Sequence, residues 1–371
     1  MKQVKLLWYS LLVLVVFVSC NSAKTSDEIL DECGSGVVLI MNKFYYKVTL
    51  PTGKVWYFTG FDEDGDMDNW TMDITEIQKN KNVITGTGFF ISEDGKILTN
   101  RHVAAPSITL SDTKHSVKSM LEALAEMVNL EMQQISEKFD ELEAEKNDCY
   151  SYNGYDGNYY VDNDKLQEIK DQQEELRTAY QNDAEVKDNL RSIDLSDLKV
   201  EPVCEVGVAY NNTFVTAESD FAPCVVTTVS NSEAVDLATI QLKDKKTPDD
   251  KHIFDVFDMD AGKGWIERML GSDDSDLKTE QKLYMLGFNA GFTLSNTSQG
   301  IKAQITSGTI SQKSDDNKIM YTIPSLPGSS GSPVVNEYGK LVAVNFAGVT
   351  GTQGFNYGIR IDKVRQFVEN Q

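Results

Sequence analysis

The chain has 371 residues, of which 40% are hydrophobic and 9% are aromatic, and its formal net charge is −22. This composition is typical of a globular protein and excludes a largely disordered chain. The acidic balance argues against nucleic-acid binding, because a protein that contacts the phosphate backbone needs a basic face.

The first twenty residues predict export. Lys2 and Lys5 precede the apolar run LLWYSLLVLVVFV, which ends at Ser19 and Cys20. A basic segment, an apolar run and a small residue form a secretory signal, and the run is shorter than the roughly 20 residues of a membrane span. The tetrad FVSC resembles a bacterial lipobox, with Phe17 where that motif prefers Leu. We therefore expect a lipoprotein signal peptide over residues 1–20 and lipidation of Cys20, with an ordinary secretory signal as the alternative.

Residues 21–34 contain the polar segment NSAKTSDE and are expected to form a tether from a bacterial membrane to the folded domain. The sequence does not indicate which face of the membrane this is. Residues 35–103 then carry short apolar runs, such as GVVLIMNKFYYKVTL and NVITGTGFFI, separated by turn signals such as EDGK. The same texture returns from about residue 200 to the end. This pattern predicts an all-β barrel or sandwich.

An acidic run, DEDGDMDNWTMD over residues 62–73, places aspartates at alternate positions. Its glycine is fourth in the run, whereas a calcium-binding EF-hand loop needs glycine at the sixth position. A solvated turn is therefore expected, and no metal site. No cofactor motif is present, so we expect none.

Residues 116–147 contain neither glycine nor proline, and their apolar residues recur three, four and seven apart. This spacing predicts a helix, and a second is predicted over residues 165–190. Together they predict a coiled-coil-like helical hairpin inserted over residues 112–199. Residues 120–200 hold 21 acidic and 8 basic side chains. The hairpin is either a solvated protrusion or an arm that binds an unknown protein, gates substrate or mediates oligomerisation.

Four cysteines remain after Cys20, and an even number in an exported chain is compatible with disulfides. Cys204 and Cys224 lie in two strand-like runs joined by one loop, so they are the expected pair; free thiols are the alternative. The other two are Cys33 and Cys149.

Three residues predict nucleophilic catalysis. A serine hydroxyl needs a base to take its proton and backbone N–H groups to stabilise the oxyanion. In PGSSGSPVV, Ser330 has glycine two positions before it and one after it. His102 ends a strand-like run, whereas His115 and His252 lie in polar stretches. Asp236, in EAVDLATIQL, is the acid with apolar neighbours.

The motifs GTGFFIS, TNRHV, DLATI and PGSSGSPVV, in this order, resemble the chymotrypsin-fold (trypsin-like) serine proteases, and especially the bacterial HtrA-like and glutamyl-endopeptidase-like branches. The resemblance covers residues 35–111 and 200–371. It implies two six-stranded antiparallel β-barrels over residues 35–371, interrupted by the hairpin. His102 and Asp236 are 134 residues apart, and about 46 apart without residues 112–199, which is ordinary for the family.

The resemblance also implies roles for single residues. Ser330 is the nucleophile, His102 the general base and then acid, and Asp236 the group that orients the imidazole. Gly328 and Ser330 supply the oxyanion-hole N–H groups. Ser332 replaces the second glycine of the commoner GSGGP pattern, and Ser329 stands where the animal enzymes have an Asp. The expected activity is an endopeptidase acting on protein or peptide substrates. A catalytically silent protease-like scaffold whose hairpin binds a partner is the alternative.

The expected specificity pocket is formed by Pro324, Ser325, Asn345, Phe346 and Ala347. Pro324 stands where enzymes that cleave after Arg or Lys carry an acid, and Asn345 stands where the Glu-specific branch has histidine. The apolar wall favours a small or medium apolar side chain in the substrate.

Overall fold

The computed structural model describes residues 23–232, 234–257, 277–312, 316–348 and 355–371. The chain divides into two compact units. One consists of Met1–Phe44, Lys81–Ser107 and Pro202–Gln371, and the other of Tyr45–Asn80 and Ile108–Glu201. The predicted signal peptide, including Cys20, lies outside the described residues. Within the described ranges, no helix is long and apolar enough to cross a membrane.

Part of the predicted tether is folded. Helix α2, Ser26–Cys33, begins at a capping box in which Thr25 and Glu28 bond to each other's backbone N–H groups. Such reciprocal bonds satisfy two N–H groups that a helix start otherwise leaves free. Ile29 and Cys33 are fully buried in the core of the first unit. The polar composition of residues 21–34 concealed this amphipathic turn, so the tether does not extend to residue 34.

The first barrel contains six antiparallel strands in the order β1-β5-β6-β11-β10-β9 and closes through the pairing of β1 with β9. Its core is formed by β-branched side chains that alternate along the strands, such as Val38, Ile40, Ile97 and Ile240. The strands are β1 (Val37–Thr49), β5 (Asn82–Phe90), β6 (Lys96–Thr99), β9 (Lys199–Tyr210), β10 (Ala222–Val229) and β11 (Ala238–Leu242).

The second barrel is closed in the order β12-β15-β16-β19-β18-β17. Leu283, Met285, Ile319 and Val342 belong to its buried core. The strands are β12 (Lys282–Gly287), β15 (Gln304–Gln312), β16 (Lys318–Tyr321), β17 (Pro333–Asn336), β18 (Leu341–Gly348) and β19 (Asn356–Arg360). Two closed six-stranded barrels confirm the predicted fold class. Shorter elements of this unit are η2 (Gly34–Gly36), α4 (Arg101–Ala104), η3 (Glu218–Asp220), α8 (Phe292–Ser295), β13 (Asn296–Thr297), β14 (Gly300–Ile301) and α9 (Ile361–Glu369).

The second unit contains a small β region and a long helical hairpin. Strand β1 continues beyond Phe44 and pairs there with β2. The acidic run 62–73 begins in the turn between β3 and β4, where the Asp62 carboxylate accepts the backbone N–H groups of Asp64 and Asp66. The elements are β2 (Val55–Phe58), β3 (Gly60–Phe61), β4 (Met67–Asp68) and α3 (Ile74–Ile77).

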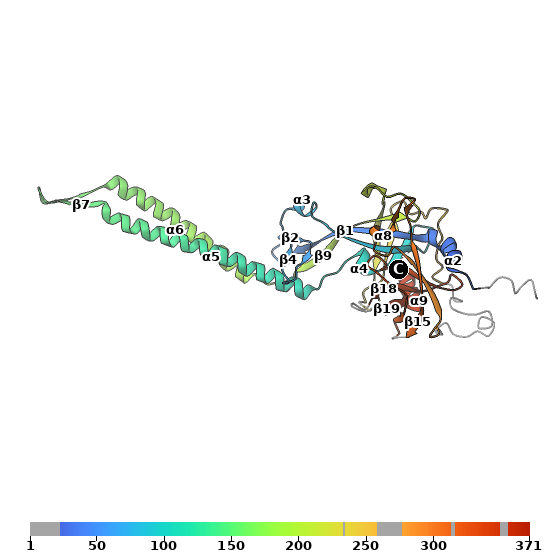
Figure 1. Ribbon diagram of the computed structural model, residues 1–371. Coiled ribbons are helices and arrows are strands. Elements are labelled where there is room, and N and C mark those ends of the chain that lie inside the picture. Colours follow the sequence, from blue (N-terminus) through green and yellow to red (C-terminus); the bar gives the residue numbers. More distant parts are fainter. Residues whose placement is uncertain (1–22, 233, 258–276, 313–315, 349–354) are drawn as a thin grey trace, which may run out of the picture. The chain divides into compact units, whose positions relative to one another are not determined.

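The predicted helices are present and are longer than expected. Helix α5 spans Leu110–Asp148 and α6 spans Asn163–Ser192, and the two run side by side (Figure 1). Strands β7 (Tyr150–Asn153) and β8 (Asn158–Val161) connect their far ends. Thr109 and Asp162 cap the two helix starts, and a Ser/Thr/Asp cap of this kind extends a helix beyond its apolar stripe.

Candidate active site

The pairing of β6 with β11 brings His102 and Asp236 together. These antiparallel strands align Thr99 with Ala238, so the chain after β6 meets the chain before β11. His102 Nδ1 lies 2.5 Å from Asp236 Oδ2, and the His102 backbone N–H donates to Asp236 Oδ1 at 3.1 Å. The Asp236 side chain is only 15% exposed, whereas that of His102 is 41% exposed. The carboxylate thus fixes the imidazole through Nδ1, and Nε2 makes no hydrogen bond with the described part of the chain.

The backbone of Asp236 is held as well. Its carbonyl oxygen accepts the side-chain amide of Asn100 at 2.8 Å and the backbone N–H of Arg101 at 3.3 Å. The Arg101 guanidinium donates to the carbonyl of Ser230 at 3.3 Å, at the start of the loop that carries Asp236. Three consecutive residues, 100–102, therefore bind the acidic loop, and the acid cannot turn away without breaking several bonds.

The serine loop connects β16 to β17 through two glycines with positive φ. Gly328 has a φ of 97°, and a Cβ there would lie 2.4 Å from the backbone nitrogen of Gly291. Gly331 has a φ of 85°, and a Cβ there would lie 2.1 Å from the carbonyl oxygen of Thr87. Both positions require glycine because of conformation and close approach together. The loop can form only with these residues on either side of Ser330.

In the segment 328–332 of this loop, two backbone N–H groups have no protein acceptor within the described part of the chain. They belong to Gly328 and Ser330, whereas those of Ser329, Gly331 and Ser332 donate to carbonyl oxygens. Two free donors two residues apart are the arrangement that stabilises an oxyanion. Ser330 is half-buried, and among the described contacts no hydrogen bond joins its hydroxyl to His102. Catalytic hydrogen bonds are often long before substrate binds.

Thr87 of β5 ties the serine loop to the first barrel. Its backbone N–H donates to the carbonyl of Ser330 at 2.8 Å, and its hydroxyl donates to the carbonyl of Gly328 at 2.8 Å. The Phe288 N–H donates to the same hydroxyl at 3.0 Å, and the Thr99 hydroxyl donates to the carbonyl of Thr87 at 2.7 Å. Thr87 thus fixes the carbonyl groups of Gly328 and Ser330, the two residues whose N–H groups remain free.

A buried network of hydrogen bonds from Asn345 and Tyr321 fixes Ser329. The Asn345 amide nitrogen donates to the Ser329 carbonyl at 3.0 Å and lies 3.2 Å from its hydroxyl and 3.3 Å from that of Ser325. The Tyr321 hydroxyl donates to Asn345 Oδ1 at 2.7 Å, which fixes the orientation of the amide. Complete burial raises the pKa of Tyr321 well above its ordinary value, so the phenol keeps its proton. Gly358 makes room for the ring, since a Cβ there would lie 2.9 Å from it.

The five residues of the predicted specificity pocket have different surroundings. Ser325 and Asn345 lie together, with the buried Asn345 occupied by the network described above. Pro324 is exposed, and Phe346 is half-buried with Lys318 Nζ 4.6 Å from its ring centre. The side chain of Ala347 lies outside the described part of the structure. Asn345 therefore supports the serine loop in addition to any contact with substrate.

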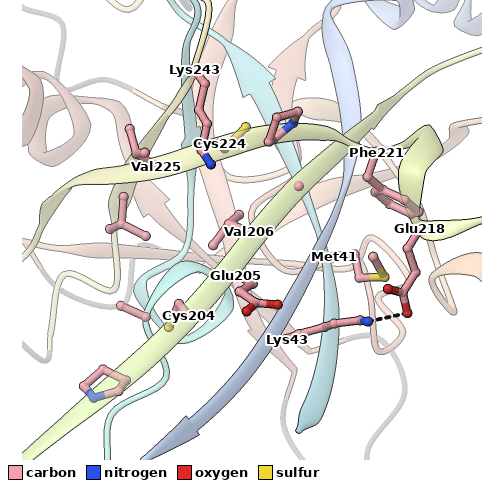
Figure 2. Close-up of a pocket in the computed structure, with 15 residues that line it drawn as sticks. Met41, Lys43, Cys204, Glu205, Val206, Glu218, Phe221, Cys224, Val225 and Lys243 are labelled. Atoms are coloured by element: carbon pink, nitrogen blue, oxygen red, sulfur yellow. Dashed lines mark ion pairs between the residues drawn. The ribbon is translucent and has the colours of Figure 1, made fainter. Parts of the chain in front are cut away.

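The predicted Cys204–Cys224 disulfide is not formed, and all four described cysteines are unbridged. Strand β9 pairs with β10 at Gly207 and Pro223, and continuing this register would place the two cysteines diagonally across the strands. Diagonal neighbours are about 7–8 Å apart, too far for a disulfide. Both cysteines line a pocket of about 650 Å³ beside the Lys43–Glu218 ion pair (Figure 2). Burial raises the pKa of Cys224 to about 12, so this thiol stays protonated.

The remaining two histidines differ from each other. His115 is exposed, as its sequence suggested, but His252 is half-buried and packs edge-on against Phe254, 4.7 Å between ring centres. Burial lowers the pKa of His252. A Cβ at Gly36 would lie 2.2 Å from the His252 carbonyl oxygen, so this segment packs closely on the start of β1. His252 is therefore a packing residue and not a surface one.

The sequence did not identify three residues of the site: Thr87, Asn100 and Tyr321. For Thr87, the signal was a small polar residue between two glycines in GTGFF, where close approach of another backbone is expected. Asn100 lies two residues before His102 and gave no signal of its own. Tyr321 gave no local signal, because its role depends on the order of strands β16, β19 and β18.

Part of the chain is similar in sequence to a known protein family. Residues 197–344 match the sequence model of the trypsin-like peptidase domain. No curated protein matches the sequence. Among solved structures, the serine endoprotease from Yersinia pestis is 11% identical, with coverage of 94% of this chain and 67% of that chain and a TM-score of 0.41.

Proposed function

We propose that this chain, whose residues 197–344 match the model of the trypsin-like peptidase domain and whose strands form two β-barrels, is a serine endopeptidase that uses Ser330, His102 and Asp236. The observation that carries the proposal is the pairing of His102 with Asp236 at 2.5 Å, together with a serine loop in which the N–H groups of Gly328 and Ser330 are free. A base oriented by a buried carboxylate and two unpaired backbone donors are the two parts that acyl transfer requires.

The proposed reaction follows from these groups. Ser330 Oγ attacks the substrate carbonyl carbon while His102 Nε2 takes its proton, and the N–H groups of Gly328 and Ser330 bind the resulting oxyanion. His102 then gives the proton to the leaving amine, the C–N bond breaks, and an acyl-enzyme remains. Water, deprotonated by the same imidazole, hydrolyses this ester and restores Ser330. The Asp236 carboxylate orients the imidazole and stabilises the imidazolium.

A fluorophosphonate probe tests the proposal, because it reacts with a serine only when a base and an oxyanion hole activate it. We expect one adduct, on Ser330, that is lost in Ser330→Ala and His102→Ala. Ser332→Ala, in the same loop, serves as the matched control and should still be labelled. A folded protein that takes no label would instead indicate a silent scaffold.

We further propose that the protein is exported and attached to a bacterial membrane through lipid on Cys20. The proposal rests on the signal-like segment 1–20 and its FVSC tetrad. Cys20→Ala should move the protein from the membrane fraction to the soluble fraction, with the export of the chain unchanged. A wild-type protein that is already soluble after export would contradict the anchor.

A small or medium apolar side chain is the proposed preference at the cleaved bond. It rests on the half-buried Phe346 and on Pro324, which stands where a trypsin-like pocket needs an acid. A peptide-library cleavage profile tests it, and cleavage mainly after Arg, Lys or Glu would overturn it.

A further inference from the structure

The tip of the helical hairpin presents an aromatic surface to solvent. In the ribbon formed by β7 and β8, Tyr150 faces Val161 and Tyr152 faces Tyr159. Cross-strand partners lie on the same face of a ribbon, and so do residues two apart. These four residues, here called the tip face, are 53%, 61%, 76% and 40% exposed in the order Tyr150, Tyr152, Tyr159 and Val161. The rings of Tyr152 and Tyr159 are 5.1 Å apart and are thus already packed into one surface.

The base of the ribbon is supported by the two helices, although every residue of its strands is exposed. Leu142, Cys149 and Ile169 form a buried cluster between α5 and α6 just below it. The Asp162 backbone N–H donates to the Cys149 carbonyl at 2.9 Å, closing the base of the ribbon. Because a two-stranded ribbon alone is marginally stable in water, this support pre-organises the tip face. Pre-organisation lowers the entropy that binding must overcome.

The composition of the tip is that of a protein-recognition surface. Residues 150–160 consist only of Tyr, Ser, Asn, Gly and Asp. Tyr offers a large and rigid contact area, and Ser, Asn and Gly adapt their hydrogen bonds, which is why antibody loops favour the same residues. Exposed aromatic surfaces with a polar rim mark interaction sites.

The negative charge around the tip face favours a positively charged partner. Residues 147–164 contain four aspartates, all exposed, and no Lys, Arg or His. They are Asp148, Asp156, Asp162 and Asp164. An arginine can stack on a tyrosine ring and pair with a carboxylate at once. A second copy of the same tip, or an anionic membrane, would instead be repelled. We infer that the tip face binds a basic protein segment that carries arginine or lysine.

The test uses the full mature chain as Ser330→Ala, so that it cannot cut the probe. The probe is a displayed library of random 12-residue peptides. We expect the selected peptides to be enriched in Arg and Lys and to bind more weakly as NaCl is raised. The triple change of Tyr150, Tyr152 and Tyr159 to Ser should weaken binding about tenfold or more, as loss of aromatic anchors does.

The matched control is Tyr160→Ser, the same substitution on the opposite face of the ribbon. It should change the affinity less than about threefold, which is below the cost of losing an interface anchor. Circular dichroism checks that both variants keep their helices. The inference would be overturned if no peptides were selected, if the selected peptides were not enriched in Arg and Lys, or if the triple variant and the control lost equal affinity. It would also be overturned if the unmodified tip mediated self-association or binding to phosphatidylglycerol vesicles, seen as loss of either in the triple variant. The test is independent of the proposed peptidase activity, since it is read with Ser330 absent.

Discussion

The side-chain amide of Asn345 lies 3.0 Å from the backbone carbonyl oxygen of Ser329, the residue between the two proposed oxyanion donors. A peptide plane links that carbonyl to the N–H of Ser330, so the hydrogen bond from Asn345 sets the direction in which this N–H points. Tyr321 in turn fixes the amide. Strands β16 and β18 thus reach the reaction centre through a buried chain of hydrogen bonds.

Asn345→Ala should therefore lower kcat by about ten- to a hundredfold while KM changes less than about threefold. The reason is that a misdirected N–H group stabilises only the transition state less well, and loss of an entire donor costs 10²–10³. Steady-state kinetics on a peptide substrate measures the split. Ser325→Ala removes a 3.3 Å contact of the same amide and a hydrogen bond to the Ser329 hydroxyl, but it leaves the bond from Asn345 to the Ser329 carbonyl, so it is the control with a small effect. An unchanged kcat in Asn345→Ala would show that the network is merely structural.

Asp236→Asn should reduce kcat by about 10³–10⁴-fold, because an amide favours the wrong imidazole tautomer and cannot stabilise the imidazolium. The thermal midpoint should move little, since the Asp236 main-chain bonds to Asn100 and Arg101 persist. Asp249→Asn, at an exposed ion pair with Lys246, controls for the loss of one negative charge. Near-normal turnover in Asp236→Asn would remove this residue from the catalytic group.

Gly331→Ala should destabilise the protein strongly, by about 3 kcal/mol or more, since it combines a left-handed backbone with a clash. The clash is with Thr87, whose carbonyl oxygen would lie 2.1 Å from the new Cβ. Gly339 also has a positive φ, 79°, but its nearest heavy atom would be 3.5 Å away. Gly339→Ala should cost only the conformational strain, about 1–2 kcal/mol. Equal losses in chemical denaturation would mean that the close approach to Thr87 is unimportant.

The half-buried His252 predicts a loss of stability in mild acid. Burial lowers its pKa in the folded protein, so below the unfolded value of about 6.5 the unfolded chain binds the proton more readily. Stability should therefore fall as pH drops from about 7 through that range, and His252→Gln should show a smaller fall in Tm between pH 7.5 and 5.5. His115→Gln, at an exposed position, should behave like the wild type. An identical pH slope in all three proteins would exclude His252 as a source.

The strand texture and the spacing of four motifs were sufficient to predict the double barrel, because alternation and turn residues are local signals. The helical hairpin was equally clear from residues 116–147, which lack glycine and proline. The grouping of 45–80 with the hairpin in one compact unit was not predicted, since it depends on contacts between segments far apart in the chain. The disulfide prediction failed for a related reason: strand register decides whether two cysteines meet, and spacing does not reveal register.

In the candidate active site too, some residues could be predicted from local sequence and others could not. His102, Asp236 and Ser330 each stood in a recognisable local pattern, and the structure brings the first two into contact. Asn345 was expected to line a pocket, yet its amide is engaged by Ser329 and Tyr321, because alternation along β18 turns it into the barrel. Supporting residues such as Tyr321 cannot be read from local sequence, since their partners are chosen by the order of strands.

The bonds from Thr87 to Gly328 and Ser330 have a consequence for the newly made chain. The proposed nucleophile, Ser330, belongs to the second barrel, and Thr87, which fixes its loop, belongs to the first. Neither barrel alone contains the complete proposed active site. Peptidase activity should therefore arise only after the two barrels have packed together. If the chain is exported as proposed, it should therefore be inactive toward its neighbours while it is still crossing a membrane.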